Sequence, residues 1–333
     1  MTSFLGFHIR RDGYGAIHSG VEKAMLCMGV PWRFVDMCDN GTWTKANTRT
    51  WDIDDTAIVL TLPDWLPDVK APKRYAFTMY ESTQTPAYYA PEINKCDALI
   101  VPTQWNADIF KANGVTVPTY ICPLGIDPDE YAPMERNGSH TGKPYTFLWS
   151  GTPDKRKGWD IVYQAFWKAF KGDEATRLVM HFRKLPKGLS DVKDHNVELY
   201  AGKFFPDFMN EMLRVADCFV YPARGEGWGL HPREAAATGL PAIATNWGGL
   251  MEGIDYWGLP LNDNGLSHAE FGAWTDDLGQ WAEPSVDELA EKMRWCFENQ
   301  KSAAYFGQNA AQWLKQNQTW SHTATRLKQI VEP

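Results

Sequence analysis

The chain has 333 residues, of which 44% are hydrophobic and 22% charged, a composition typical of a globular protein with room for two domains. No apolar run of about 18 residues predicts a membrane span, and Met1–Leu5 lacks the layout of a signal peptide, so we expect a cytoplasmic protein without stable membrane insertion. The formal net charge is −8, with an acidic excess in both halves, which argues against a DNA or anionic membrane partner.

The cysteines are scattered, form no CxxC pair and mostly lie inside apolar runs. We therefore expect them to be reduced residues of the core. They are Cys27, Cys38, Cys96, Cys122, Cys218 and Cys296.

Short apolar runs alternate with helical periodicity along the first half of the chain. Phe4–Ile9 predicts a buried strand, and the glycine loop Arg10–Gly15 follows it. The next segment predicts a helix with one apolar face, made of Ile17, Val21, Ala24, Met25 and Met28. Apolar runs without alternation are typical of parallel strands covered on both faces. They predict further strands at Trp32–Met37, Thr56–Leu62, Ala76–Tyr80, Ala98–Val101 and Thr119–Cys122.

A second series of the same kind follows the polar segment Met134–Lys143, which predicts a domain linker. Tyr145–Trp149 predicts its first strand, and a helix opens at Lys157 and Gly158. The buried face of that helix is predicted to consist of Ile161, Val162, Ala165, Phe166, Ala169 and Phe170. Further strands are predicted at Arg177–Phe182, Cys218–Tyr221 and Ala242–Thr245. Because strands and helices alternate in both halves, we expect an α/β protein of two doubly wound, Rossmann-like domains.

The segment Tyr221–Thr245 reads as a strand, a glycine turn, a helix, a glycine stop and a strand. Its three glycines, Gly225, Gly227 and Gly229, let the backbone approach a ligand closely and leave amide donors at the start of a helix. Such helix starts attract anions through unpaired N–H groups and the macrodipole. The turn is therefore a candidate anion site.

Two glutamates accompany this turn. Glu226 precedes the predicted helix, and Glu234 lies within it, close to two helical turns further on. Both carboxylates would then face the same cleft at different depths, one near a sugar and the other near a ribose diol. The alternative is an ordinary glycine turn with two solvated glutamates, since glycine turns often precede helices.

Several segments of the chain, in the expected order, resemble retaining glycosyltransferases of family 4. GEGWGLHPREAAATGLPAIAT, at Gly225–Thr245, is similar to their Glu-x7-Glu signature. Ile121–Asp127 looks like the segment before their interdomain linker, and Phe147–Phe166 like the first strand, loop and helix of their C-terminal domain. Phe77–Thr83 and Val101–Phe110 are similar to N-domain segments of one bacterial branch. The resemblance covers nearly the whole chain and implies transfer of a sugar from a nucleotide diphosphate-sugar.

The resemblance also implies an architecture, the GT-B fold, in which two Rossmann-like domains face a central cleft. Residues 1–140 would form an acceptor-binding domain and residues 141–315 a nucleotide-sugar-binding domain. Residues 316–333 would form a C-terminal helix that crosses back to the N-domain. Closure of the domains would exclude water, which otherwise hydrolyses the activated sugar.

Roles for single residues follow from matching the family motif. Glu234 would hold the ribose hydroxyls of the nucleotide, and Glu226 would contact the transferred sugar as a catalytic residue. Lys157 would neutralise the diphosphate, which also explains a lysine at a helix start, where it opposes the macrodipole; the alternative is a solvated lysine. The backbone amides that would lie against the sugar and diphosphate belong to Gly227, Trp228, Gly229 and Leu230.

One departure from the family pattern concerns an arginine that relatives place shortly before this lysine. The equivalent stretch here, Ser150–Thr152, has none. Arg156, or Arg183 with Lys184 after the next strand, would supply the missing charge.

Candidate residues in the N-terminal half are weaker matches. Gly13, Tyr14 and Gly15 resemble the glycine loop that faces the diphosphate, although a short Gly-x-Gly is also an ordinary turn. Glu81 falls where relatives present a polar residue to the donor sugar, and the alternative is a solvated loop glutamate. His8 is expected to be a core histidine of the first strand.

Two Asp-x-Asp pairs, Asp52 with Asp54 and Asp127 with Asp129, have a spacing that can hold a divalent metal. Each lies in a predicted turn, where aspartates are favoured without any ligand. Lys157 and a helix start can stabilise a leaving diphosphate without a metal. We therefore expect no metal and no cofactor apart from the nucleotide-sugar co-substrate, UDP- or GDP-linked.

The acceptor is open between a glycan, a small molecule and modified DNA. One alternative function is therefore a transferase that glycosylates modified bases in DNA, which the acidic charge opposes. A second alternative is a non-catalytic module that binds nucleotide-sugars, which the joint presence of Glu226, Glu234 and Lys157 opposes.

Overall fold

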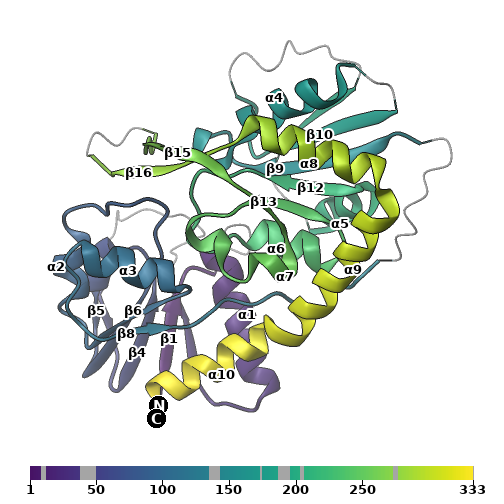
Figure 1. Cartoon of the computed structure of the whole chain (residues 1–333). Helices are drawn as coiled ribbons and strands as arrows, with labels where there is room; N and C mark the ends of the chain where they lie inside the picture. Colours follow the sequence, from purple (N-terminus) through teal and green to yellow (C-terminus); the bar gives the residue numbers. More distant parts are fainter. Residues whose placement is uncertain are drawn as a thin grey trace. The chain divides into compact units, whose positions relative to one another are not determined.

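The protein folds into two compact units (Figure 1). The structure, a computed structural model, describes residues 1–8, 13–37, 50–134, 143–172, 175–186, 196–202, 206–272 and 277–332. Unit 1 consists of Met1–Asp127 with Gln318–Pro333, and unit 2 of Pro128–Asn317. The chain thus enters unit 2 before the predicted boundary near residue 140, and the Met134 amide already donates to the Thr238 carbonyl there. Residues 135–142 of the predicted linker lie outside the described residues.

Unit 1 contains a six-stranded parallel sheet in the order β2-β1-β4-β6-β7-β8. Its strands are β1 (Ser3–Gly6), β2 (Arg33–Asp36), β4 (Thr56–Leu60), β6 (Lys73–Phe77), β7 (Ala98–Val101) and β8 (Thr119–Ile121). The short strands β3 (Trp51–Asp52) and β5 (Val69–Lys70) form a separate parallel pair. The strand order reverses at β1, since β2 lies on one side of it and β4 on the other.

Helices cover this sheet. They are α1 (Gly13–Cys27), the 3-10 helix Pro63–Asp68, α2 (Tyr89–Ile93), α3 (Gln104–Ala112) and α10 (Trp320–Val331). α3 begins after Thr103, whose hydroxyl accepts the Asn106 amide at 3.1 Å and satisfies an N–H of the first turn.

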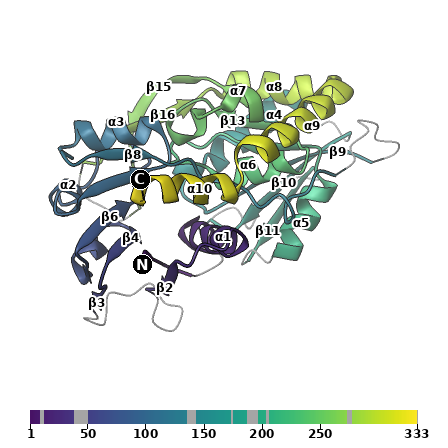
Figure 2. The same ribbon diagram turned by 90° about the horizontal axis from the view of Figure 1, so that it is seen from below.

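The C-terminal helix α10 packs against α1 within unit 1, as both ribbon views show (Figure 2). A Cβ on Gly20 of α1 would lie 2.3 Å from the Trp320 ring, so only glycine lets the two helices come this close. A Cβ on Gly125 would lie 2.1 Å from the Thr319 backbone, and Ile126 forms a parallel bridge with Thr319. The end of the chain is therefore an integral part of unit 1.

Unit 2 contains a second six-stranded parallel sheet, in the order β11-β10-β9-β12-β13-β14. Its strands are β9 (Tyr145–Gly151), β10 (Thr176–Phe182), β11 (Val197–Ala201), β12 (Cys218–Tyr221), β13 (Ala242–Thr245) and β14 (Leu259–Leu261). The chain runs outward from β9 to β11 and then returns to the other side of β9 with β12. This is the doubly wound strand order of Rossmann folds, and ligands bind where the order reverses.

The helices of unit 2 include two short turns that matter for the site. They are the 3-10 helix Lys155–Lys157, α4 (Trp159–Phe170), α5 (Pro206–Val215), α6 (Leu230–Ala237), the 3-10 helix Gly248–Met251, α7 (Ile254–Trp257), α8 (Val286–Glu298) and α9 (Gln300–Asn317). An antiparallel hairpin of β15 (Asp263–His268) and β16 (Gln280–Pro284) completes the unit. The two parallel sheets with their helices confirm the predicted α/β class of two Rossmann-like domains.

The N-terminal segment differs from the sequence prediction in three details. β1 ends at Gly6, and His8 beyond it is exposed, so the prediction of a core histidine at this position is wrong. The His8 amide donates to the Asp36 carboxylate at 3.1 Å. α1 begins at Gly13, so Gly13–Gly15 form its first turn rather than a loop. Met28 follows the end of the helix and is exposed.

Two expectations from composition can be compared with the structure. Cys96, Cys122, Cys218 and Cys296 are buried, as expected, whereas Cys27 is exposed at the end of α1. Cys38 lies outside the described residues. In the part of the chain that the structure describes, no helix is long and apolar enough to cross a bilayer.

Candidate active site

The candidate site in unit 2 lies where the strand order of its sheet reverses. β9 and β12 are neighbours there, and both run in the same direction, so their carboxyl ends lie side by side. The basic turn Lys155–Lys157 follows β9, and the glycine turn Gly225–Gly229 follows β12. The sheet topology thus brings together two segments about 70 positions apart in the sequence.

Glu226 and Lys157 form an ion pair across these two turns. The Tyr221 hydroxyl donates to the same carboxylate oxygen at 2.8 Å, and Arg156 Nη1 lies 3.4 Å from it. Both partners of the ion pair are largely shielded, with 14% of the Lys157 and 10% of the Glu226 side chain exposed. Burial by itself raises the pKa of Glu226, but the charges of Lys157 and Arg156 and the hydrogen bonds lower it to about 2. The carboxylate is therefore ionised at neutral pH.

The conformation of the glycine turn depends on Gly229 within it and on Gly249, which packs against it. Gly229 has φ +84°, in the left-handed region that glycine adopts without strain. A Cβ on Gly249 would lie 2.0 Å from the Gly227 carbonyl oxygen, and the Gly249 amide donates to the Glu226 carbonyl at 2.7 Å. The backbone on both sides of Glu226 is therefore fixed by close backbone packing.

Arg233, which the sequence analysis did not single out, fixes the same turn from inside. Its side chain is fully buried, and its guanidinium lies over the rings of Trp228 and Trp257, at 3.9 and 4.4 Å from their centroids. It donates to four backbone carbonyls, those of Trp228, Gly229, Gly249 and Glu252. Burial lowers the pKa of Arg233 to about 9, so the guanidinium remains charged at neutral pH. Arg233 therefore stabilises the backbone conformation of the turn.

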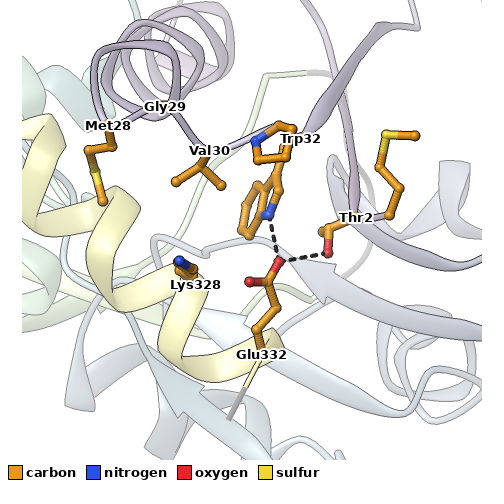
Figure 3. A pocket seen from close by; sticks show the side chains of 9 residues that line it. Thr2, Met28, Gly29, Val30, Trp32, Lys328 and Glu332 are labelled. Atoms are coloured by element: carbon orange, nitrogen blue, oxygen red, sulfur yellow. Dashed lines mark hydrogen bonds between the residues drawn. The ribbon is translucent and has the colours of Figure 1, made fainter.

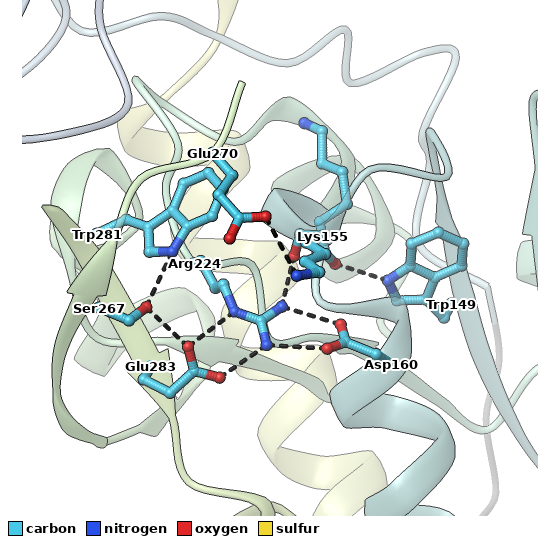
Figure 4. A network of polar contacts seen from close by, with 9 residues as sticks. Trp149, Lys155, Asp160, Arg224, Ser267, Glu270, Trp281 and Glu283 are labelled. Atoms are coloured by element: carbon cyan, nitrogen blue, oxygen red, sulfur yellow. Dashed lines mark hydrogen bonds and ion pairs between the residues drawn. The ribbon is translucent and has the colours of Figure 1, made fainter. Parts of the chain in front are cut away.

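Arg224 ties the basic turn to the rest of unit 2 (Figure 4). Its guanidinium makes paired hydrogen bonds to Asp160 of α4, both at 2.9 Å, and to Glu283 of β16, at 3.0 and 2.7 Å. It also donates to the Lys155 carbonyl at 2.6 Å, and the Arg224 amide donates to the Arg156 carbonyl at 2.6 Å. These contacts hold the backbone of the turn that carries Arg156 and Lys157.

A glycine allows the two turns to touch. Gly158, between the basic turn and α4, has φ +68°, and a Cβ there would lie 1.9 Å from the Pro222 carbonyl oxygen. The Lys157-Gly158 pair of the sequence therefore has a steric basis as well as an electrostatic one. Arg156 also donates to the Gly225 carbonyl at 2.8 Å, which joins the turns once more.

Glu234 lies in α6 in different surroundings from Glu226. Burial and the negative charge of Glu130 raise the pKa of Glu234 to about 8, and a hydrogen bond with the Tyr131 side chain partly offsets this. The neighbours that shift the pKa of Glu234 are thus an acidic residue and a tyrosine from the segment just after Asp127. The charged neighbours that shift the pKa of Glu226 are basic. That the two carboxylates face one cleft stays a prediction.

His231 lies at the start of α6, near the ion pair. Its ring meets the Tyr221 ring edge-on, with centroids 6.4 Å apart. Burial and the positive charge of Lys157 lower the pKa of His231 to about 4, so the imidazole is neutral at physiological pH. It can therefore offer a hydrogen bond without adding charge.

The candidate residues of unit 1 lie near the carboxyl end of β6. The Tyr14 hydroxyl and the Thr78 hydroxyl are 3.2 Å apart. Burial, followed by the neighbouring Tyr14, Tyr88 and Glu81, raises the pKa of Tyr89, which places Tyr14 and Glu81 around one tyrosine. Glu81 itself is half-buried rather than a fully solvated loop residue.

The Asp-x-Asp pairs lie in ordinary surroundings. Asp52 is the last residue of β3 rather than part of a turn as predicted, and Asp54 follows it; both are exposed. Asp127 pairs with Lys23 at 2.6 Å. Among the described residues, neither pair belongs to a cluster of three metal-ligating side chains. The cluster of that kind in the described residues consists of His8, His18 and Glu22.

A cavity of about 460 Å³ in unit 1 is lined by Met28, Val30, Trp32 and Lys328, among others, and by none of the candidate site residues (Figure 3). The Glu332 carboxylate at its edge accepts hydrogen bonds from Trp32 Nε1 at 2.8 Å and from the Thr2 hydroxyl at 3.3 Å. These bonds connect Glu332 to the residues that precede β1 and β2.

Comparison with known proteins supports a glycosyltransferase reading. Residues 144–278 match the family described as "Glycosyl transferases group 1". D-inositol 3-phosphate glycosyltransferase of Geodermatophilus obscurus is 28% identical over 155 residues, which are 41% of this chain and 34% of that protein, so the chain spans about a third of this relative.

Solved structures resemble the chain over almost its whole length. Sucrose-phosphate synthase from Thermosynechococcus elongatus superposes with a TM-score of 0.70 at 14% identity, over 99% of this chain and 98% of the other. Anabaena HepE, in complex with UDP and glucose, superposes with a TM-score of 0.68 at 13% identity, over 99% of each chain. The chain therefore has the GT-B fold of these enzymes, and its residues 144–278 are similar to the Glycosyl transferases group 1 family.

Proposed function

We propose that this chain is a retaining glycosyltransferase that moves a sugar from a nucleoside diphosphate-sugar to an acceptor. The observation that carries the proposal is the shielded ion pair of Lys157 with Glu226 at the reversal of strand order in unit 2. A structural ion pair of this kind contributes little net stability, because desolvation opposes the attraction. Lys157 and Arg156 lie at the edge of a Rossmann sheet where ligands bind. A diphosphate site explains these two cations better than a purely structural ion pair does.

Each residue of the pair has a proposed task. Lys157 and Arg156 offset the charge that grows on the leaving diphosphate, which lowers the barrier to breaking the glycosidic bond. Glu226, ionised by these cations, accepts hydrogen bonds from hydroxyls of the transferred sugar. Its low pKa excludes a role as a general acid near neutral pH. The amides of Gly227–Leu230 would contact the sugar and diphosphate on a backbone that Arg233 holds in place.

The nucleotide would lie along α6, with Glu234 at the ribose. A carboxyl group whose pKa is about 8 is partly protonated at neutral pH. Ribose hydroxyls that donate to it favour the ionised form, so donor binding would release a proton. In unit 1, Glu81, with Gly13, Tyr14 and Gly15, would serve the donor sugar and diphosphate.

Two further observations narrow the choice of donor and acceptor that the fold alone would allow. The HepE complex holds UDP and glucose, and this supports UDP-sugars as the first donors to test, with GDP-sugars second. The net charge of −8 favours a glycan or small-molecule acceptor over DNA. Since Lys157 and Arg156 supply the charge, we propose that the transfer needs no divalent metal.

The test is a thermal-shift screen against UDP-, GDP-, ADP- and dTDP-sugars, because a ligand that binds the folded state raises the melting temperature. Nucleotide release is then followed with the stabilising donor and a panel of acceptors, and NMR of the anomeric proton reports the stereochemistry. Transfer with retention supports the proposal. Binding of a donor with no hydrolysis or transfer over the whole panel would identify a non-catalytic binding module instead.

A further inference from the structure

Three side chains able to bind a metal converge in unit 1, on the helix that begins with Gly13–Gly15, and none of the three is assigned to sugar transfer. His18 and Glu22 lie one turn apart on α1, and His8 follows β1. Their ligand atoms all lie within 4.8 Å of one another, and His8 Nε2 is 3.6 Å from Glu22 Oε2. The spacing His-x3-Glu on a helix is the signal for this cluster in the sequence, and the sequence analysis did not use it.

Among the three residues, His18 gives the strongest indication of a ligand. It is 2% exposed, and among the described residues its ring nitrogens make no well-formed hydrogen bond, although the Val35 backbone approaches the ring. The rings of Phe4 and Phe34 pack around it, with centroids 5.5 and 5.7 Å away. A buried polar group without a partner costs free energy, and native structures rarely leave one unexplained. A bound cation would give the imidazole the partner that the protein does not provide.

The backbone around His18 is adapted to this arrangement. A Cβ on Gly6 would lie 2.9 Å from His18 Cδ2, so glycine lets the imidazole lie against the end of β1. The Asp36 carboxylate at the end of β2 accepts the His8 amide at 3.1 Å and thereby holds the second histidine at the same edge. The His8 and Glu22 side chains are 48% and 32% exposed, so they are free to turn toward one ion.

We propose that His8, His18 and Glu22 bind one Zn²⁺ ion, with water in the fourth position. Two imidazoles and a carboxylate form a ligand set that zinc proteins use, at about 2.0–2.2 Å from the metal. Mg²⁺ and Ca²⁺ prefer sites made of oxygen atoms, and two imidazoles do not suit them. The ion would fasten the segment after β1 to α1. This role is structural and does not depend on the proposed sugar transfer.

The test is direct metal binding by the full chain. Protein stripped with a chelator and dialysed is titrated with Zn²⁺ against a chromophoric competitor, and its metal content is measured by plasma mass spectrometry. We expect one equivalent of Zn²⁺ per chain and a higher melting temperature with Zn²⁺ but not with Mg²⁺. Co²⁺ in place of Zn²⁺ should give the visible absorption of a four-coordinate site.

Variants locate the site without disturbing the core. His8→Ala changes an exposed side chain and Glu22→Gln a half-buried one. Each should weaken Zn²⁺ binding by more than about tenfold, since even changes around a ligand cost that much. His268→Ala is the matched control, because His268 is an exposed histidine 3.9 Å from a carboxylate, that of Asp277, in unit 2. Absence of a bound equivalent, or equal Zn²⁺ affinity in wild type, His8→Ala and Glu22→Gln, would overturn the proposal and leave the His8–Glu22 contact as a surface ion pair.

Discussion

Lys157 and Glu226 lie 69 positions apart in the sequence and form an ion pair that is largely closed to solvent. The pair depends on two turns, each of which follows one of two adjacent parallel strands. Tyr221, from the end of β12, donates to the same carboxylate at 2.8 Å. A charged ligand entering here would compete with Glu226 for the lysine, so binding of the proposed diphosphate would be coupled to the position of the carboxylate.

Replacement of Lys157 tests this coupling. Lys157→Ala should weaken binding of a nucleoside diphosphate by roughly tenfold or more, because a charge-assisted hydrogen bond of about 1.5–3 kcal/mol is lost. Binding of the plain nucleoside should change little, and turnover should fall more than in Lys157→Arg. Titration calorimetry with both ligands measures the difference. Lys155→Ala is the control, since the Lys155 side chain is 62% exposed and pairs with Glu270. Equal losses for nucleoside and nucleoside diphosphate would contradict the assignment.

Arg224 should matter for both stability and ligand binding. Arg224→Gln leaves Asp160 and Glu283 without their shared cation. Because these carboxylates are 25% and 38% exposed, the loss should cost about 1.5–3 kcal/mol in the free energy of unfolding, less than for a fully buried pair. Because the Lys155 carbonyl also loses its donor, the basic turn should become less ordered and diphosphate affinity should fall. Urea unfolding and calorimetry measure the two effects.

Arg177→Gln is the matched control for this change. Arg177 pairs with Glu198 at 3.0 Å on a strand away from the turn, and its side chain is 30% exposed. Its loss should cost less than about 1 kcal/mol and leave diphosphate affinity unchanged. If Arg224→Gln reduced stability alone and the surviving folded protein bound diphosphate normally, Arg224 would not be a positioning residue.

Glu234 should make nucleotide binding depend on pH. Its pKa is raised to about 8, so the ligand-free carboxyl is mostly protonated below this value and ionised above it. If the ribose hydroxyls donate to the carboxylate, affinity should rise by roughly tenfold between about pH 7 and 9, and binding at pH 7 should release a proton. Calorimetry in buffers of different ionisation enthalpy counts that proton. In Glu234→Gln the affinity should be lower and its pH dependence in this range should disappear; an unchanged profile would remove Glu234 from the nucleotide site.

Chelation of divalent metals should leave sugar transfer intact. In the proposed site the diphosphate would be met by Lys157 and Arg156, which pair with Glu226, and the exposed Asp52 and Asp54 carboxylates belong to unit 1. Turnover in excess EDTA, and donor affinity in Asp52→Ala with Asp54→Ala, should match the wild type. The assay is run well below the melting temperature and repeated with His8→Ala, so that loss of the proposed zinc is not mistaken for loss of a catalytic metal. Activity abolished by EDTA and restored by Mn²⁺ or Mg²⁺ in both proteins would overturn the metal-free reading.

The sequence by itself determined the fold class, the glycine turn and most of the central strands, whereas β6 (Lys73–Phe77) begins three residues before the predicted Ala76–Tyr80. β12 and β13 have the predicted bounds because short apolar runs between glycines and charged residues leave few other conformations. The predicted face of α4 is buried as expected, since helical periodicity is a local property. The glycine turn was marked by its own spacing, whereas the roles of Lys157 and Glu226 came from the resemblance to family 4 glycosyltransferases.

Only the tertiary structure decided which charged side chains meet. Arg224 and Arg233 carry no local pattern that marks them, because their partners come from segments brought near by strand order and by the β15–β16 hairpin. The histidines show the same limit. A pattern of apolar neighbours predicted His8 to be buried, yet β1 ends at Gly6, and the histidine that is buried in this part of unit 1 is His18 of α1. Local sequence sets backbone conformation and hydrophobic faces, whereas the partners of polar groups depend on which elements become neighbours when the sheets form.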